Sequence, residues 1–237
     1  PFKYLDAQYS LNSDQETTVK SSQIDSGPPK VLLCGYNGAN NTGAEAKLLA
    51  TIEDMRSLLG PEAILTVPSL DERNLRRYLK ETDTLRIVPI PTLYKRTVKR
   101  LVKEHDLIIL VEGSCYIETF TKALLDAYLW ATTCADKYGK PVIAYAVDSG
   151  QVSPTSIEKI RREASKTDLV IMRTEAGAER MHSWGVTAPI EATADTAFIF
   201  KTNPADRDIA QKEFPESTSG LIGIAAVDFF LFPVKPK

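Results

Sequence analysis

The chain has 237 residues, of which 43% are hydrophobic and 25% charged, a balance typical of globular proteins. A formal net charge of −2 excludes a strong bulk attraction to nucleic acid or to an anionic membrane, so we expect no nucleic-acid partner. No apolar run reaches the roughly 18 residues of a transmembrane segment. The start of the chain also lacks the basic and apolar regions of a signal peptide, and we expect a cytoplasmic protein.

Residues 1–29 are polar, and we expect an extended or poorly ordered lead-in there. From residue 30 onward, short apolar runs alternate with amphipathic segments at a spacing of roughly 20–30 residues. This alternation predicts an α/β domain over residues 30–200, with a Rossmann-like open parallel sheet and helices on both faces. The expected strands are Val31–Gly35, Ala63–Val67, Leu85–Pro89, Asp106–Val111, Val142–Val147, Leu169–Met172 and Pro189–Ala192.

Helical patterns fill the intervals between these strands. They cover about residues 43–59, a segment beginning near Asp71, Tyr94–Glu104, about 120–138, a segment from Ser153 or Thr155 to about 166, and Glu175–Trp184. The helix over 94–104 is strongly basic. We expect a solvated face there rather than a polyanion site, because the sequence shows no second basic cluster.

The apolar rhythm stops after residue 200. Residues 201–219 are rich in Asn, Pro, Asp, Glu and Ser, and we expect a linker that contains one polar helix. A new apolar run begins at Gly220. We interpret residues 220–237 as the start of a second α/β domain that is truncated or missing.

The loop after the first strand is the first candidate site. Its glycines and asparagines tolerate positive φ and allow close approach of a ligand. The following helix start offers free N–H groups and a partial positive charge to an anion such as a phosphate or carboxylate. A tight turn with helix caps is the alternative. The candidate binding residues are Gly35, Asn37, Gly38, Asn41, Thr42, Gly43 and Glu45.

The ends of later strands supply further candidates, because ligands of open α/β sheets lie beyond the carboxyl ends of the strands. After the fourth strand, Gly113 permits a sharp turn and Ser114 offers a hydroxyl. Glu112 is a candidate general base, or it orders this loop. After the fifth strand, Asp148 and the adjacent Ser149 are candidates to bind a substrate hydroxyl, or Asp148 caps the loop.

The ends of the sixth and seventh strands add two more candidates at the carboxyl edge of the sheet, which is the rim of the expected site. Arg173 leaves the sixth strand, where a guanidinium would grip a carboxylate or phosphate with two parallel hydrogen bonds. The alternative is a structural ion pair with Glu175 or Asp195. Asp195 itself follows the seventh strand and reaches the same rim, either as a ligand contact or as the partner of Arg173. Of all these residues, Glu112 and Asp148 are the candidates for a catalytic role.

The sequence predicts no metal site and no cofactor. Its three cysteines are far apart, without paired metal spacing or a disulfide framework, and we expect small buried residues. The two histidines, His105 and His182, are expected at the surface or in helix caps. They cannot be combined with a serine and an acid into a catalytic triad.

Four segments in order resemble the polysaccharide pyruvyl transferase family. They are Gly35-x-x-Gly38-x-x-Asn41-x-Gly43-x-Glu45, the strand from Asp106 into Gly113, Gly139-Lys140-Pro141-Val142 with its strand, and Asp168 through Arg173 followed by Gly185-Val186 and Asp195-Thr196-Ala197-Phe198. The last segment is the most specific. The chain departs from the family pattern at Ala44, Glu112 and Asp148.

The resemblance implies an enzyme of exopolysaccharide biosynthesis that transfers a pyruvyl group from phosphoenolpyruvate to a sugar of a cell-surface polysaccharide. It also implies a two-domain fold like that of GT-B glycosyltransferases, a glycan or lipid-linked sugar as acceptor, and a donor contact by Arg173. A GT-B-like glycosyltransferase or sugar-nucleotide enzyme is the alternative, and the departures leave open a non-catalytic relative. Homo-oligomerisation is left open as well.

Overall fold

A computed structural model describes residues 27–118, 122–201 and 204–214. The chain divides into two compact units, Pro1–Phe200 and Lys201–Lys237. In the described part of the second unit, helix α7 covers Pro204–Glu213. The strand expected at residue 220 and most of the polar lead-in lie outside the described residues, so the proposed division into domains stays a prediction.

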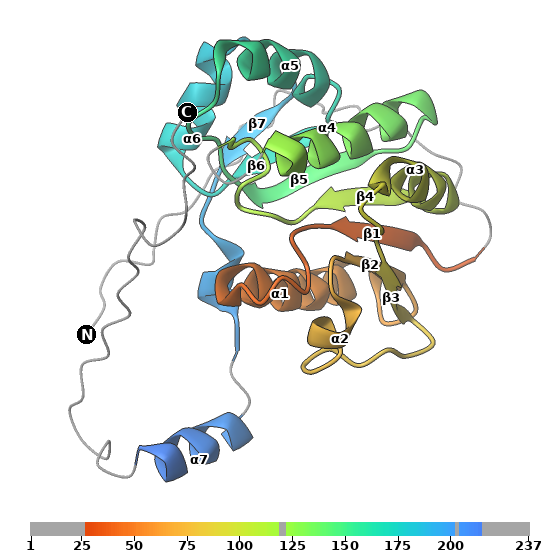
Figure 1. Ribbon diagram of the computed structural model, residues 1–237, viewed down its shortest axis with the longest axis vertical. Helices are drawn as coiled ribbons and strands as arrows, with labels where there is room; N and C mark the ends of the chain where they lie inside the picture. Colours follow the sequence, from red (N-terminus) through yellow and green to blue (C-terminus); the bar gives the residue numbers. More distant parts are fainter. Residues whose placement is uncertain (1–26, 119–121, 202–203, 215–237) are drawn as a thin grey trace. The chain divides into compact units, whose positions relative to one another are not determined.

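Seven parallel strands form one sheet in the order β3-β2-β1-β4-β5-β6-β7 (Figure 1). β1 pairs with β4, with Leu32 opposite Ile108. The strand order therefore reverses between these two strands, at the kind of position where open α/β sheets bind ligands. The strands are β1 (Lys30–Cys34), β2 (Ile64–Ser69), β3 (Leu85–Pro89), β4 (Leu107–Leu110), β5 (Val142–Val147), β6 (Leu169–Met172) and β7 (Ile190–Ala192).

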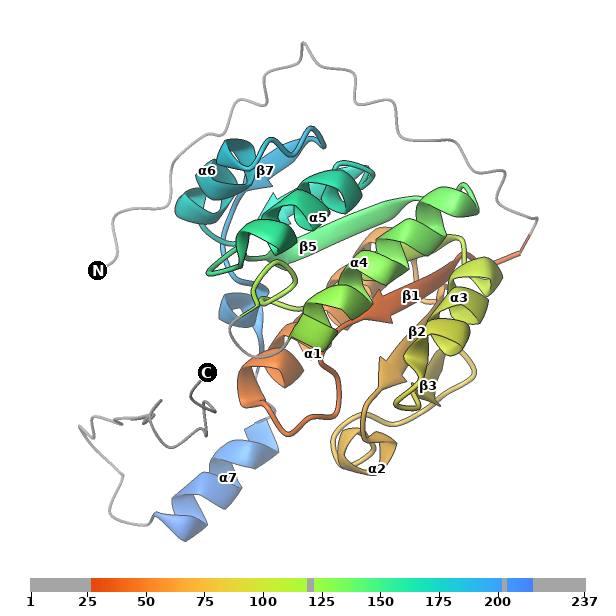
Figure 2. The same ribbon diagram turned by 45° about the horizontal axis from the view of Figure 1, so that its top comes forward.

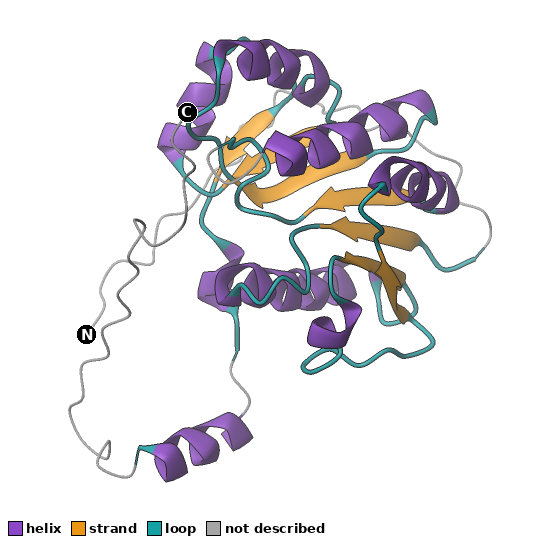
Figure 3. Cartoon of the chain, viewed as in Figure 1, coloured by secondary structure: helices purple, strands orange, loops and turns teal. Residues whose placement is uncertain are grey.

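Helices cover both faces of the sheet (Figures 1 and 3). They are α1 (Thr42–Leu59), α2 (Glu72–Leu75), α3 (Tyr94–Glu104), α4 (Lys122–Lys137), α5 (Pro154–Ala164) and α6 (Glu175–Ser183), with a short 3-10 helix, η1 (Thr196–Ile199). α1 and α2 pack on one face, and α3 to α6 pack on the other (Figure 2). The expected Rossmann-like fold is confirmed, and element ends differ from expectation by at most two residues.

The two cores follow from the alternation of side chains along the strands. Leu32 and Ile108 face the α3–α6 side, whereas Val31, Leu33 and Ile109 face α1 and α2. A central strand covered by helices on both faces is apolar on both faces, as β4 is and as β1 is after its exposed first residue, Lys30. The three cysteines are buried and unpaired, as expected, and burial raises the pKa of Cys34 to about 12.

The two histidines lie in a helix cap and at the surface, as expected. His105 caps the end of α3 but is buried, with Nδ1 2.6 Å from the Leu101 carbonyl and Nε2 2.8 Å from Thr66 Oγ1. Burial lowers the pKa of His105 and so favours the neutral ring. His182 lies in the last turn of α6 and is exposed, as expected.

Among the helices of the described residues, none combines the length and hydrophobicity needed to cross a bilayer.

Candidate functional site

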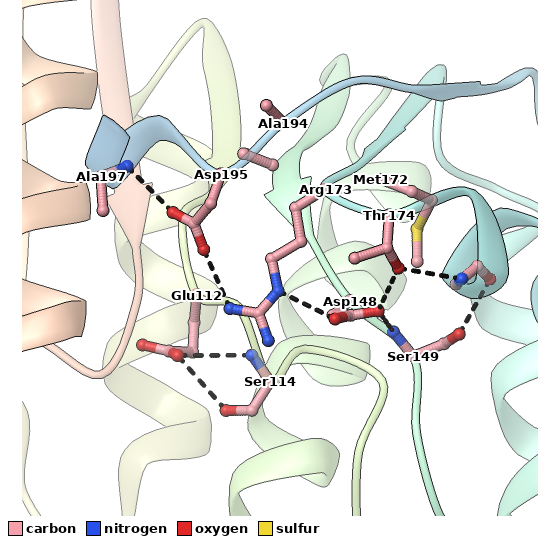
Figure 4. A network of polar contacts seen from close by, with 12 residues as sticks. Glu112, Ser114, Asp148, Ser149, Met172, Arg173, Thr174, Ala194, Asp195 and Ala197 are labelled. Atoms are coloured by element: carbon pink, nitrogen blue, oxygen red, sulfur yellow. Dashed lines mark hydrogen bonds and ion pairs between the residues drawn. The ribbon is translucent and has the colours of Figure 1, made fainter. Parts of the chain in front are cut away.

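Arg173 lies between two carboxylates at the carboxyl edge of the sheet (Figure 4). Its Nε donates to Asp148 Oδ2 at 2.8 Å, and its Nη1 donates to Asp195 Oδ2 at 3.0 Å. The three residues follow β6, β5 and β7, so parallel strand ends bring them together. The ion pair with Asp195 that the sequence left as an alternative is present, but 32% of the Arg173 side chain remains exposed.

Lys47 binds the second carboxylate oxygen of Asp195, the one that Arg173 does not contact. Lys47 is not among the residues predicted from the sequence. It belongs to α1, and only 4% of its side chain is exposed. Its Nζ donates to Asp195 Oδ1 at 3.3 Å and to the Ala146 carbonyl at 2.5 Å. Lys47 lies between Ala44 and Thr51 on the buried face of α1, where an unpaired ammonium would be costly.

The Ala146 carbonyl reaches Lys47 because β5 is irregular at this point. The pairing of β5 with β6 shifts register between Ala144 and Val147. Ala146 has φ +51°, in the left-handed region that a non-glycine residue adopts only at a cost. Such strain is kept where the surroundings demand it. Here the turned carbonyl secures a buried cation directly beside the carboxylate cluster.

Asp195 is held ionised by its neighbours. Burial alone would raise its pKa, but the Ala197 N–H, the Lys47 ammonium and the Arg173 guanidinium together outweigh burial and lower the pKa. The Ala197 N–H donates to Asp195 Oδ1 at 2.9 Å, so Asp195 also caps η1. Asp195 therefore joins the start of η1 to both cations.

Glu112 follows β4, and its pKa shifts in the opposite direction from that of Asp195. Burial raises the pKa of this carboxyl, although hydrogen bonds from Ser114 and the charge of Lys47 oppose the rise. The Ser114 N–H and Oγ lie 3.3 and 3.4 Å from Glu112 Oε1, so Glu112 does order its loop. The neighbouring Gly113 packs against Arg173, because a Cβ added there would lie 2.6 Å from Arg173 Nη1.

Asp148 has both oxygens engaged. Its Oδ2 accepts from Arg173, and its Oδ1 accepts from the Ser149 N–H at 2.9 Å and the Thr174 hydroxyl at 3.3 Å. Thr174 in turn caps α6 by accepting from the Gly177 N–H. Asp148 thus fixes the start of α6 relative to Arg173, which is the loop-ordering alternative that the sequence offered.

A shallow hollow of about 360 Å³ opens beside Asp148. Ser149 lies within it, with its hydroxyl donating to the Gly177 carbonyl at 2.9 Å. Arg180, which the sequence analysis did not single out, donates from Nη1 to the Ser149 carbonyl. The hollow is lined by Asp148, Ser149, Gly150, Gln151, Thr174, Ala176 and Arg180.

The asparagines of the first loop have structural roles. Asn37 is buried, and its amide donates to the carbonyls of Leu33 and Pro68 at 3.1 and 3.0 Å. Asn41 is the N-cap of α1 and accepts from the Ala44 N–H at 3.0 Å. Turn and cap geometry therefore accounts for these two asparagines, and ligand binding by them stays a prediction.

The rest of that loop faces α2. Gly38 has φ +79°, and an added Cβ would lie 2.4 Å from the Asp71 carbonyl, so this turn requires glycine. Asn74 of α2 donates to the Gly38 carbonyl and to Glu45. Thr42 and Gly43 form the exposed first turn of α1, and Gly35 packs against Asn37. Ligand binding by these residues stays a prediction.

The chain is an α/β protein with a Rossmann-like sheet, and cations and carboxylates gather at the carboxyl edge, where open sheets of this class commonly bind ligands. A sequence model of the polysaccharide pyruvyl transferase family matches residues 41–232, most of the chain. The chain belongs to this family. Comparison with curated protein sequences gave no significant match.

Several solved structures resemble part of this chain at low sequence identity. A protein provisionally classed as a UDP-N-acetylglucosamine 2-epimerase from Listeria monocytogenes is 16% identical, with a TM-score of 0.44, over 68% of this chain and 43% of that one. The UDP-GlcNAc 2-epimerase of Neisseria meningitidis, solved with UDP-GlcNAc, is 12% identical, with a TM-score of 0.38, over 81% and 46%. The glycosyltransferase GlyE of Streptococcus pneumoniae TIGR4 is 17% identical, with a TM-score of 0.32, over 57% and 29%. The aligned part of the chain spans less than half the length of each of these three proteins.

Proposed function

We propose that the protein transfers a pyruvyl group from phosphoenolpyruvate to a sugar of a cell-surface polysaccharide or its lipid-linked precursor. The observation that carries this proposal is Arg173, a partly exposed guanidinium held in place by Asp148 and Asp195, in a chain of the pyruvyl transferase family. Phosphoenolpyruvate carries a carboxylate and a phosphate, and both are natural partners of a fixed guanidinium.

The charges of the site suit an anionic donor. Lys47, Arg173 and Arg180 supply three cations beside the carboxyl groups of Asp148, Asp195 and Glu112, and burial raises the pKa of Glu112. Among the described residues, Arg173 Nη2 has no hydrogen-bond partner. The N–H groups of residues 175 and 176 at the start of α6 likewise find no acceptor there. These donors, together with the hollow beside Asp148, would hold the carboxylate and phosphate of the donor.

The transfer also needs a proton donor. A proton adds to the enol carbon C3, C2 becomes electrophilic, and one sugar hydroxyl adds there. Loss of phosphate and addition of a second hydroxyl then complete the cyclic ketal. Glu112 suits this role better than Asp148, because burial keeps its carboxyl protonated to higher pH, whereas Asp148 has both oxygens engaged by donors. Once it has given up its proton, Glu112 would accept one from the attacking hydroxyl.

Replacing Gly113 by alanine tests the position of Arg173 without removing it. The new Cβ would lie 2.6 Å from Arg173 Nη1, the end of a flexible side chain, so the guanidinium shifts and the backbone does not. We expect phosphoenolpyruvate affinity to fall about tenfold or more, while the free energy of unfolding falls by less than about 1 kcal/mol. Calorimetric titration and urea unfolding measure the two quantities.

The matched control is Gly27→Ala, because a Cβ there meets no described atom within 4 Å. This variant should keep the wild-type affinity. Equal affinities for Gly113→Ala and wild type would show that the Arg173 position does not matter for the donor.

Glu112→Gln tests the proton donor, because it should lower turnover while it raises stability. We expect turnover to fall about 100-fold or more, with phosphoenolpyruvate affinity nearly unchanged, because the proton donor is lost but the cations remain. The folded-state pKa of Glu112 is raised, so its ionisation at neutral pH opposes folding. The variant should therefore unfold at a higher temperature than wild type at pH 7, and the difference should vanish below the pKa of an unfolded glutamate.

The exposed Glu191→Gln is the control, with neither effect expected. A Glu112→Gln enzyme with full turnover would remove Glu112 from the mechanism, and Asp148 would become the next candidate.

Thermal-shift measurements test the donor class. Phosphoenolpyruvate should raise the melting temperature of the protein, whereas UDP- and GDP-sugars should not. Stabilisation only by a nucleotide-sugar would favour a sugar-nucleotide enzyme or glycosyltransferase instead.

A further inference from the structure

Positive charge is concentrated on one helix of this slightly acidic protein. The full chain has a formal net charge of −2. α3 nevertheless carries five basic side chains against a single acid, Glu104. All five are exposed, as expected from the sequence: Lys95, Arg96, Lys99, Arg100 and Lys103. Because charges act over about one Debye length of 10 Å, this face attracts anions whatever the bulk charge is.

Few of these charges are neutralised. Glu104 pairs with Arg100 at 3.0 Å, and this pair is largely exposed. Lys95 and Lys103 lie over the rings of Trp130 and Tyr138, contacts that keep their charge. Arg96 and Lys99 have no acidic partner within the part of the chain that the structure describes. On the adjacent α4, Asp126 is paired with Lys159.

The amino-terminal end of the same helix is apolar. Leu93, directly before α3, is 87% exposed, and Leu70, directly after β2, is 50% exposed. A cavity of about 400 Å³ opens here, with residues on both sides of Leu93 in its wall. Its walls come from the ends of β1 to β3 and from α3 and α4, and include Tyr36, Ile90, Tyr94, Leu124 and Tyr128. The Tyr128 hydroxyl is buried and has no partner among the described residues.

We propose that α3 and Leu93 form a docking surface for an anionic lipid bilayer. Lipid phosphates would contact the basic face, Leu93 would enter the boundary with the acyl chains, and the cavity would accept an apolar chain. Peripheral membrane binding draws on this combination of an apolar contact and attraction to anionic lipids. A nucleic acid or a free phosphate would use the charges but would leave the exposed leucine and the apolar cavity without a role.

The docking surface lies at the same edge of the sheet as the candidate site. α3 begins after β3, so its amino-terminal end and the cavity lie at the carboxyl edge of the sheet, as does the Arg173 cluster. Docking would place that edge near the bilayer. Membrane docking by the basic face, Leu93 and the cavity holds or fails independently of the donor chemistry.

Vesicle flotation tests the proposal with the 237-residue protein. Wild type should bind vesicles of phosphatidylcholine mixed with phosphatidylglycerol, and not vesicles of phosphatidylcholine alone. Arg96→Gln with Lys99→Gln should lower the partition coefficient about 30-fold, since each basic residue contributes roughly a fivefold factor. Leu93→Ser should lower it about tenfold.

The matched control removes two charges from the opposite face, Arg73→Gln with Lys80→Gln at and near α2, and should bind as wild type does. Equal loss in both double variants would overturn the proposal, because it would show a bulk charge effect. Displacement by inorganic phosphate at low concentration, or RNA binding that depends on Arg96 and Lys99 but not on Leu93, would also overturn it.

Discussion

Arg173→Ala is expected to lower phosphoenolpyruvate affinity about 100-fold, since it removes the guanidinium that we assign to the donor. It also leaves Asp148 and Asp195 without their shared cation. We expect the free energy of unfolding to fall by about 2 kcal/mol, below the range for fully buried pairs, because 32% of the Arg173 side chain is exposed. Calorimetric titration and urea unfolding give the two numbers.

Arg173→Lys separates the loss of donor affinity from the loss of stability. A lysine keeps the charge but cannot bridge two carboxylates with a planar fork, so donor affinity should stay low while part of the stability returns. The control, Arg161→Ala, removes an exposed arginine paired with Glu158 on α5 and should change neither quantity. Donor affinity that survives in Arg173→Ala would make this residue purely structural.

Lys47→Met should be the most destabilising single change at the site. Only 4% of the Lys47 side chain is exposed. Its removal leaves Asp195 and the turned carbonyl of Ala146 without the hydrogen bonds that the ammonium donates. We expect the free energy of unfolding to fall by about 3 kcal/mol. Methionine keeps the apolar length of the side chain, so the loss reports the missing ammonium rather than a cavity.

Lys159→Met is the matched control, because Lys159 also pairs with an aspartate, Asp126, but at a partly exposed position. It should cost less than about 1 kcal/mol. In a double-mutant cycle, Lys47→Met and Asp195→Asn should show a coupling of about 2 kcal/mol. A coupling near zero would mean that Lys47 serves the Ala146 carbonyl alone.

The fold could be predicted because its signals are local. Each strand is a short apolar run, and each helix has a cap or an amphipathic period, as with Asp71 before α2 and Ser153 before α5. The seventh strand, only Ile190–Ala192, was also found, since a glycine and a proline separate it from α6.

The site was predicted in part. Arg173, Asp148 and Asp195 were expected at one edge because parallel strands end there, and the structure joins them by hydrogen bonds. Lys47 could not be placed from spacing alone, because its role depends on the left-handed turn at Ala146 and on η1 bringing Asp195 beside α1. These are tertiary features without a local signature.

The first loop contains two asparagines with structural roles that their number alone does not reveal. Asn37 and Asn41 suggested a ligand, yet one supports the turn and the other caps α1. Asparagine favours caps and turns because its side chain hydrogen-bonds nearby backbone groups. Composition alone therefore cannot distinguish a binding loop from a well-capped turn.

The central proposal is tested most directly by following phosphoenolpyruvate labelled with ¹³C at C2 in the presence of candidate glycans and lipid-linked sugars. We expect the labelled carbon to appear as a ketal carbon on the glycan, with one phosphate released per ketal formed, in wild type but not in Arg173→Ala. Unchanged phosphoenolpyruvate alongside consumption of a nucleotide-sugar would contradict the proposed reaction.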